Sequence, residues 1–506
     1  MQIVQMMVIL LLKGGVKVSS ILHLSNLLAR KEISSVELTK KYLSAINNIN
    51  PSINAYISVT EEMALLQAQK ADDMRKQLKG DAPLLLGIPM ALKDNLAVRG
   101  FQTTCCSKTL ENFKSTYTAT AVQKLFNNGA ILLGKTNMDE FAMGSYSNTG
   151  IFGATFNPYD TAKSAGGSSG GSAAAVSSRI APYTLGTDTG GSARQPASFC
   201  GVVGYKPTYG TVSRYGAVAL ASSFDQISPI ANTVKDCAIV YDTIKGFDIN
   251  DMTTIKQNYA PCLDRINGNV KGVKIGIATK LFENCSKDVV DSVYRAIETY
   301  RGLGAEIVDI TIPTIELALP IYYIIGCAEI SSNFGRYDGI RYGYKTNKSY
   351  KDIDDMIAKT RSEAFGDDVK RRIMLGIYFL SKNNFNEYYL KAIQLRNELT
   401  SDFENVFKQC DLIISPTTPT TALAFDFNPD NVVDKYKADI CVVIANVCGL
   451  PAISLPCGTD SNGLPVGMQL IGPKNSDSRV LNTAFAFENT ANLKLNPTLG
   501  GVTYDI

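Results

Sequence analysis

The strongest constraint on the fold is an alternation of short apolar runs with helical segments along the 506-residue chain. The apolar runs are bounded by glycine or proline, as buried strands are. We expect strands in LLLGIPMAL (84–92), GAILLGK (129–135), GVKIGIA (272–278), AEIVDI (305–310), LIISP (412–416), AISLP (452–456) and VGMQLIG (466–472). Helical periodicity is clear at 36–47, and we expect further helices at 61–77 and about 286–303. SPIANTVKDCAIVYDTI (228–244) indicates a turn leading into a helix. This alternation predicts an α/β layered sheet with buried, largely parallel strands.

The chain shows no internal repeat, heptad run or low-complexity linker. We therefore expect residues 18–506 to form one large domain, with a helical insertion or cap at about 315–407 over one end of the sheet. The first residues, MQIVQMMVILLLKGG, lack a positive leading region and a cleavage site and are shorter than the roughly 20 residues of a membrane span. We interpret residues 1–17 as an N-terminal extension, either a tail or a stretch added by an early start codon.

Charge and cysteine usage exclude several classes of function. The 50 basic and 47 acidic residues are mixed along the chain and give a net charge of only +3, with no basic block. Binding of nucleic acid by this chain alone is therefore disfavoured. The eleven cysteines include no C-x-x-C pair, which argues against zinc and against a disulfide framework. Reduced cysteines suit a cytoplasmic protein without a membrane anchor or a bound metal.

One motif resembles a phosphate-binding loop but is better explained as a strand. GAILLGKT (129–136) fits the pattern G-x-x-x-x-G-K-[ST]. The apolar AILL between its glycines would direct its amides into a sheet rather than toward a phosphate. We expect no nucleotide site here.

The histidine content restricts the catalytic chemistry. His23 is the single histidine, in ILHLSNLL on an expected N-terminal helix, away from every glycine cluster. A Ser-His-Asp or Cys-His site would need His23 to fold into it, so a serine nucleophile requires another base, and lysine remains. A lysine acts as a base only when burial or positive charge lowers its pKa from about 10.4. Lys93 ends an apolar run before a polar turn, and Lys135 is the competing candidate.

Two glycine-serine clusters suggest how a nucleophile would be presented. Gly166-Gly167-Ser168 and Gly190-Gly191-Ser192 lie on either side of an alanine-containing segment, with the two serines 24 positions apart. Glycine permits unusual backbone angles and close approach of a substrate to main-chain amides, which could stabilise an oxyanion beside Ser192. A single such cluster would usually be only a loop. Two clusters, a lysine at the end of an apolar run and no usable histidine favour a nucleophile.

These motifs together resemble the amidase signature family. GGSSGGSAAAV is followed by DTGGSARQPASFCG, with GIPMALKDN upstream and GKTNMDEFAMGS between, and the likeness runs from about residue 20 to 490. SSNFGRYDGIRYG, DDVKRRIMLG and NVCGLPAISLPCG resemble the branch of the family that hydrolyses glutamine for tRNA-dependent amidotransferases. The family fold implied is a large mixed, mostly parallel sheet covered by helices on both faces.

The resemblance implies a Ser-cisSer-Lys triad. Ser192 matches the nucleophile, Ser168 matches the bridging serine after a cis peptide bond, and Lys93 matches the base. Neutral Lys93 would take a proton through the Ser168 hydroxyl as Ser192 attacks, then return it to the leaving nitrogen. Water would hydrolyse the acyl-enzyme.

Further residues are assigned by the same resemblance. Ser169 would support the lysine, and an oxyanion hole would be formed by Thr189, Gly190 and Gly191. Thr187 stands where serine is frequent in the family, and we expect no functional consequence.

For glutamine as substrate, the branch pattern maps a cation and an anion onto this chain. Arg372 would hold the α-carboxylate and Asp439 the α-ammonium, with Tyr323 lining the pocket. A planar guanidinium suits a carboxylate. Arg371 is adjacent, so the arginine assignment is open by one position, and a surface role is the alternative for both charges.

The implied partners are amidotransferase subunits B and C in a heterotrimer. The partner would bind ATP and magnesium and the misacylated Glu-tRNA(Gln), with Asp-tRNA(Asn) as a second candidate, while this chain holds no cofactor. One alternative is a free-standing amidase for another small or fatty amide. A second is a non-catalytic assembly protein within the complex, which the presence of Lys93, Ser168 and Ser192 disfavours.

Overall fold

The computed structural model describes residues 20–78, 82–257, 259–425 and 439–500. The expected extension at 1–17 lies outside these ranges. The strands of the described residues form one 11-stranded sheet. In spatial order they are β1 (Tyr56–Val59), β3 (Ile131–Thr136), β2 (Pro89–Lys93), β4 (Tyr183–Thr187), β6 (Ile227–Ala231), β5 (Val203–Lys206), β10 (Ala452–Thr459), β11 (Pro465–Ile471), β9 (Leu412–Pro416), β7 (Lys274–Ile277) and β8 (Glu306–Asp309). The expected strands are all present.

The sheet is mixed, as expected, but the expectation of mostly parallel strands is wrong. Parallel pairing is confined to two blocks, β3–β2–β4 and β9–β7–β8. The strands between them pair antiparallel, from β4 through β6, β5, β10 and β11 to β9, and β1 is antiparallel to β3. A strand covered on both faces reads as a continuous apolar run in either direction, so the sequence pattern does not report strand direction.

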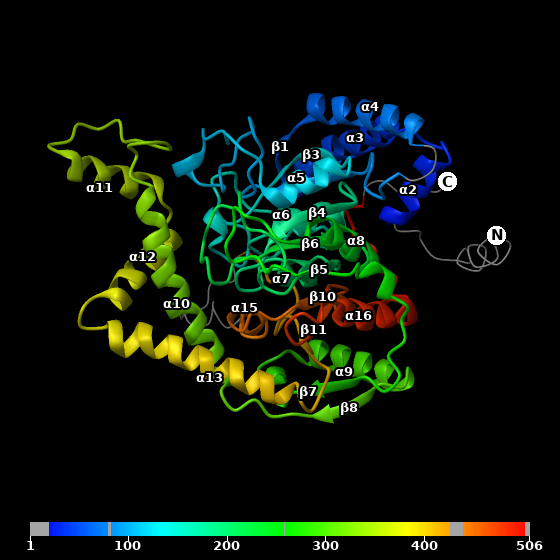
Figure 1. Cartoon of the computed structure of the whole chain (residues 1–506). Helices are drawn as coiled ribbons and strands as arrows, with labels where there is room; N and C mark the ends of the chain where they lie inside the picture. The colour runs from blue at the N-terminus through cyan, green and yellow to red at the C-terminus, as the bar shows by residue number, and fades with distance from the viewer. Residues whose placement is uncertain (1–19, 79–81, 258, 426–438, 501–506) are drawn as a thin grey trace.

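Helices cover the sheet on both sides. In Figure 1, α6 (Gly170–Ser177) and α7 (Arg194–Phe199) lie on one side of the central strands, and α8 (Val234–Ile244) and α16 (Asp477–Ala491) lie on the other. Both α7 and α8 pack on β5. The remaining helices around the sheet are α2 (Ile21–Ala29), α3 (Ser35–Ile53), α4 (Glu61–Gln77), α5 (Thr120–Asn127), α9 (Lys287–Gly302) and α15 (Val443–Val447).

The start of α3 illustrates how the sequence sets an element boundary. Ser34 Oγ accepts a hydrogen bond from the amide of Glu37 at 3.1 Å, and the Glu37 carboxylate accepts from the amide of Ser34 at 2.8 Å. This capping box satisfies two amides that have no partner within the helix. It explains why the helix begins at Ser35.

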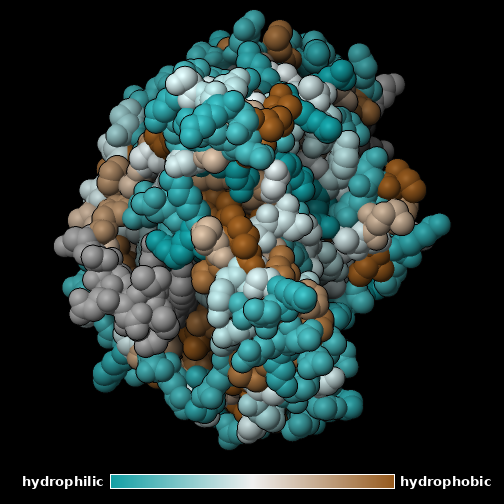
Figure 2. Space-filling model, turned by 90° about the vertical axis from the view of Figure 1, so that its left-hand side faces the viewer, coloured by the Kyte–Doolittle hydropathy of each residue, from teal (hydrophilic) through white to brown (hydrophobic). Residues whose placement is uncertain are grey.

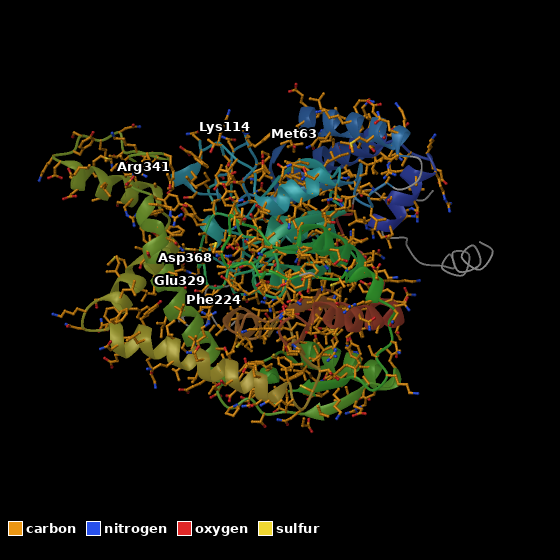
Figure 3. All side chains as sticks on the ribbon, viewed as in Figure 1. Met63, Lys114, Phe224, Glu329, Arg341 and Asp368 are labelled. Carbon is orange, nitrogen blue, oxygen red and sulfur yellow. The ribbon has the colours of Figure 1, made fainter. Side chains whose placement is uncertain are left out.

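Residues 315–407 are largely helical and lie along one side of the molecule. They contain α10 (Ala318–Asn333), α11 (Ile353–Ala364), α12 (Asp367–Leu380) and α13 (Lys391–Val406), at the left of Figure 1. Glu329 of α10 accepts a hydrogen bond from the Ser223 amide at 2.9 Å. The ring of Phe224 packs on Tyr322 with centroids 5.6 Å apart. Figure 3 labels Phe224 and Glu329 in the same region of the molecule. The helices are thereby fixed against the body that carries the sheet.

Among the described residues, one helical stretch, Ile315–Arg336, is long and apolar enough by length and composition to cross a membrane. Half of its most apolar window is buried, and α10 packs against α12, α13 and α15. The core helix of a folded domain has these properties. Figure 2 shows the side of the molecule that bears these helices as largely hydrophilic, with separate hydrophobic patches.

Candidate active site

Lys93 is the last residue of β2, in the middle of the parallel block. Its side chain is fully buried. The Nζ atom forms hydrogen bonds with Ser168 Oγ at 2.7 Å and with Thr187 Oγ1 at 2.9 Å. Because β2 pairs with β4, which ends at Thr187, the sheet itself brings the lysine and this hydroxyl together.

Burial lowers the pKa of Lys93 to about 7, although the charges of Asp139 and Asp188 act in the opposite direction. A large fraction of this lysine is therefore neutral near neutral pH, which a proton acceptor requires. Lys135, the competing candidate, instead forms a buried ion pair with Asp94 Oδ1 at 2.9 Å. Lys93 is thus the lysine that the structure places against a serine hydroxyl.

Ser168 follows a cis Gly167–Ser168 peptide bond and lies just before α6. Two hydrogen bonds of Ser169 join this loop to its neighbours. The Ser169 amide donates to the carbonyl of Ser192 at 3.0 Å, and its hydroxyl donates to the carbonyl of Thr187 at 3.1 Å. Ser169 therefore supports Lys93 indirectly, through the backbone of the residue whose hydroxyl contacts the lysine.

The hydroxyl of Thr187 has a direct role in this network. It contacts Lys93 and also accepts from Asn95 Nδ2 at 3.0 Å. Threonine supplies the same hydroxyl as serine, which explains why threonine can replace serine at position 187.

A buried ion pair supports the loop that carries Ser192. Arg194 Nη2 lies 3.0 Å from Asp188 Oδ1, and both side chains are completely buried. The Asp188 carboxylate also accepts from the amides of Gly191 at 2.9 Å and Ala193 at 3.3 Å. Burial alone would raise the pKa of Asp188, but Arg194, together with Lys206 and Asn446, outweighs burial and holds this pKa well below its usual range. The loop is therefore organised around a permanent negative charge.

The amides that remain for an oxyanion differ partly from the expected set. Gly191 donates to Asp188, which removes it from the available donors. Within the described ranges, the amides of Thr189, Gly190 and Ser192 have no acceptor. Thr189 and Gly190 of the expected set thus remain available beside the nucleophile candidate.

The glycines of this loop are required by their surroundings. A Cβ at Gly190 would lie 2.4 Å from Tyr322 Cζ. Gly191 has φ +110°, and its Cβ would lie 2.2 Å from Val442 Cγ2. No larger residue fits without displacing the Tyr322 ring or the Val442 side chain.

Ser192 is partly exposed, whereas Ser168 and Lys93 are buried. In the described structure no hydrogen bond joins the hydroxyls of Ser192 and Ser168, although the Ser169 amide links their loops. Catalytic contacts of this kind are often looser before substrate binds. Ser192 is the member of the expected triad that a substrate can reach.

The expected substrate residues lie next to this loop. Asp439 is buried, and its carboxylate accepts from Tyr323 Oη at 3.0 Å and from Ser145 Oγ at 3.0 Å. Burial raises the pKa of Asp439 to about 6, so it is ionised at neutral pH. Val442, which packs against Gly191, donates its amide to the carbonyl of Asp439 at 3.0 Å.

The structure distinguishes the two adjacent arginines. Arg372 of α12 is buried, and its guanidinium carbon lies 5.4 Å from the centre of the Tyr323 ring. Its charge lowers the pKa of Asp439, which places the cation and the anion near each other. Arg371 pairs with Asp368 and is 40% exposed; Figure 3 shows Asp368 on α12. Arg372 is therefore the arginine that faces Tyr323 and Asp439.

The other motifs stand apart from this site. GAILLGKT forms β3 from residue 131 onward and is buried, which confirms that it is a strand. His23 lies on α2, across the molecule from α10 and α12 in Figure 1. In the described part of the chain, no group of three or more histidine, cysteine, aspartate or glutamate side chains is arranged to hold a metal ion.

Sequence reasoning did not assign roles to Arg194, Asp188 and Ser145. Arg194 is the only basic residue of DTGGSARQPASF, and Asp188 is its only acidic residue. Opposite charges among small and uncharged residues are a signal for a buried pair. Ser145 carries no comparable signal, because its contact with Asp439 joins segments far apart in the chain.

Comparison with known proteins agrees with this geometry. The Amidase family model matches residues 37–481. The A subunit of glutamyl-tRNA(Gln) amidotransferase from Caldanaerobacter subterraneus subsp. tengcongensis is 49% identical over 481 residues, 95% of this chain and 98% of that protein. Its namesake from Neisseria meningitidis serogroup C is 47% identical over 463 residues, 91% of this chain and 95% of that protein. The crystal structure of the Thermotoga maritima namesake has a TM-score of 0.79 at 37% identity and covers 97% of this chain and 100% of that chain.

The chain therefore belongs to the amidase family, and its fold is the α/β fold of that family. Within the family it is similar over nearly its whole length to the A subunits of glutamyl-tRNA(Gln) amidotransferases. The resemblance inferred from the sequence motifs is confirmed.

Proposed function

We propose that this chain is the glutamine-hydrolysing subunit of a tRNA-dependent amidotransferase and supplies ammonia to its partners. The proposal rests on two buried residues of opposite charge, Arg372 and Asp439, beside the loop of Ser192. We call this pair the clamp. Glutamine offers an α-carboxylate and an α-ammonium of the matching signs. Relatives with nearly full-length similarity are named as glutamyl-tRNA(Gln) amidotransferase A subunits.

The geometry suggests the following sequence of proton transfers. Ser192 Oγ attacks the carboxamide carbon of glutamine, and its proton passes to Ser168 as Ser168 gives its own proton to neutral Lys93. The Nζ atom of Lys93 lies within reach of this proton, 2.7 Å from Ser168 Oγ. The amides of Thr189 and Gly190 stabilise the oxyanion. Lys93 then returns the proton through Ser168 to the departing ammonia.

Water completes the cycle by attacking the glutamyl ester on Ser192. Its proton follows the same route to Lys93, and glutamate leaves with the Ser192 hydroxyl restored. Since the buried lysine is neutral at the start of each half-reaction, one base serves both.

The partners complete the reaction. Subunits B and C form a heterotrimer with this chain in the cytoplasm. The partner activates Glu-tRNA(Gln), or Asp-tRNA(Asn), with ATP and magnesium and adds the ammonia. This division is supported by the lack of a basic block in the sequence and by the strand structure of GAILLGKT.

The test measures amidation by the assembled complex with glutamine or with free ammonia as nitrogen donor. Ser192→Ala is expected to abolish the glutamine-dependent reaction and to leave the ammonia-dependent reaction intact, because ammonia bypasses the acyl-enzyme. Labelling of Ser192 by a serine-reactive probe identifies the nucleophile independently.

The two alternatives give different results in the same experiment. A free-standing amidase would hydrolyse simple aryl or fatty amides alone and would show no gain with partner and tRNA. A non-catalytic assembly protein would leave glutamine-dependent amidation unchanged after Ser192→Ala. Either result would overturn the proposal.

A further inference from the structure

Two adjacent buried carboxylates, Asp139 and Glu140, lie in the GKTNMDEFAMGS stretch behind the substrate clamp. Asp139 accepts from the amides of Ser147 at 2.8 Å and Asn148 at 3.0 Å. It thereby fixes the loop after Ser145, whose hydroxyl donates to Asp439. Asp139 thus supports Asp439, the anionic residue of the clamp, through the loop that carries Ser145.

Glu140 contacts the N-terminus of α12, the helix that carries Arg372, the cationic residue of the clamp. Its carboxylate accepts a hydrogen bond from the Gly366 amide at 2.9 Å and one from Ser107 Oγ at 2.5 Å. Gly366 is the N-cap of α12 and has no side chain with which to cap the helix. A residue from a different part of the chain therefore accepts from the N-cap amide of α12, one of the amides that a helix leaves without an internal partner.

Glu140 lies so close to Gly366 that there is no free space for a side chain at position 366. A Cβ at Gly366 would lie 2.3 Å from Glu140 Oε2. Further along α12, a Cβ at Gly376 would lie 2.0 Å from the carbonyl oxygen of Cys327 on α10. Glu140 at one end and α10 along its length therefore define where α12 lies.

Arg372 sits between these two anchor points. It is on α12, less than two helical turns beyond Gly366, because a turn holds about 3.6 residues. A shift of the N-terminus of α12 moves Arg372 relative to Tyr323, on which its guanidinium packs at 5.4 Å.

We propose that Glu140 is a positioning residue that sets the place of Arg372 and thereby selects amides carrying an α-carboxylate. This inference rests on the proposed glutamine clamp. Glu140 touches neither the substrate nor the reacting atoms; it acts through the first turn of α12.

The test uses the whole complex and the variants Glu140→Leu and Glu140→Gln, each alone and with Arg372→Ala. Glu140→Leu removes the acceptor at similar size and is expected to raise KM for glutamine about tenfold, the effect of losing this hydrogen bond and the contact it positions. The kcat at saturation is expected to stay within about twofold. The α-carboxylate is remote from the reacting amide, so weakening its contact with Arg372 destabilises the bound ground state and the transition state equally. Glu140→Gln keeps an oxygen that accepts from Gly366 and restores KM to within about threefold of wild type.

The double variant separates positioning from general support. Once Arg372 is alanine, Glu140→Leu has no guanidinium left to misplace, so it is expected to change KM by less than about threefold. A full tenfold effect in both backgrounds would overturn the inference. If Arg372→Ala itself leaves KM for glutamine unchanged, the clamp of the proposed function fails, which is a distinct result.

Asp236 provides a matched control. It is a buried carboxylate that accepts from the amide of Ile21 at 2.8 Å, at the start of α2, and α8, which carries it, lies away from α12 in Figure 1. Asp236→Leu is expected to leave KM unchanged. If Glu140→Leu instead lowers kcat and ammonia-dependent amidation together, Glu140 is only structural and the inference is wrong.

A second variant tests the same contact in case Glu140→Leu does not fold. Gly366→Pro removes the amide that donates to Glu140, and proline suits the φ of −70° found at this position. The same rise in KM for glutamine, with ammonia-dependent amidation intact, is expected. An unchanged KM would overturn the inference.

Discussion

Arg194 and Asp188 form a completely buried ion pair behind the loop of Ser192, with Nη2 and Oδ1 3.0 Å apart. The guanidinium also donates to the carbonyl of Val442 at 2.9 Å and to Gln469 Oε1 at 2.9 Å. The pair thus joins the nucleophile loop to β11 and to the segment that follows Asp439. One arginine connects the chemical centre with the expected substrate clamp.

Arg194→Met is expected to destabilise the protein by about 3–5 kcal/mol, because it leaves the Asp188 charge buried without a partner. Glutamine hydrolysis should be lost with it. Chemical denaturation of the variant, read by circular dichroism, measures the change. Arg301 is the control: it pairs with Glu298 at 2.7 Å but is 54% exposed, so Arg301→Met should cost at most about 1 kcal/mol. Equal losses for the two variants would contradict the role given to burial.

Removal of either end of the proton path should abolish glutamine hydrolysis. We expect Ser192→Ala and Lys93→Met to be inactive with glutamine, and the double variant to be little worse than either, because the residues act as a unit. Lys135 supplies the contrast, since its Nζ is bound to Asp94 Oδ1 at 2.9 Å. Lys135→Met should lower stability by about 3–5 kcal/mol. Near-native hydrolysis by Lys93→Met would show that the base has been misassigned.

The glycine preceding Ser192 should not tolerate a side chain. Gly191→Ala places a Cβ 2.2 Å from Val442 Cγ2 and forces φ +110° on alanine. We expect glutaminase activity to fall by at least about a hundredfold, since a displaced oxyanion loop loses interactions of several kcal/mol. At Gly302, the end of α9, an added Cβ would meet nothing within 4 Å, and Gly302→Ala should retain full activity. Steady-state kinetics with glutamine on both variants provides the comparison.

The sequence predicted element positions better than element directions. The strands at 412–416 and 452–456 fall within the observed β9 and β10, because each is an apolar run ending at a polar or proline boundary. The turn expected at the start of SPIANTVKDCAIVYDTI is instead largely strand, because β6 extends to Ala231. It pairs antiparallel with β4 and β5, contacts that no local pattern reveals.

For the site too, local sequence patterns identify single residues but not the contacts between segments that are far apart in the chain. Lys93 could be singled out because it ends a buried strand, and Ser192 because glycines precede it. Arg372 and Asp439 came from resemblance, since the segments that bring them to Tyr323 are far apart in sequence. The positions of Ser145 and Glu140 depend on tertiary contacts with residues more than two hundred positions away, so no spacing rule could have found them.

The last prediction concerns pH and involves two groups. Burial lowers the pKa of Lys93 to about 7 and raises the pKa of Asp439 to about 6. Lys93 must be neutral to accept a proton, and Asp439 must be charged to hold the α-ammonium, so both must lose a proton before glutamine is used. The value of kcat/KM, which reports the free enzyme, should therefore rise with pH and level off above about 7.

The slope of that profile separates the two groups. For wild type, log kcat/KM should rise by about two per pH unit below about pH 6, where both groups are protonated, and by about one between about pH 6 and 7. Asp439→Asn removes the second titration, so its lower but measurable kcat/KM should rise with a slope of about one at every pH below about 7. His23→Gln should leave the wild-type profile unchanged, because His23 lies on α2, across the molecule from the clamp. A slope of about two that persists in Asp439→Asn would assign the lower titration to another group, and a limb lost in His23→Gln would overturn lysine as the base.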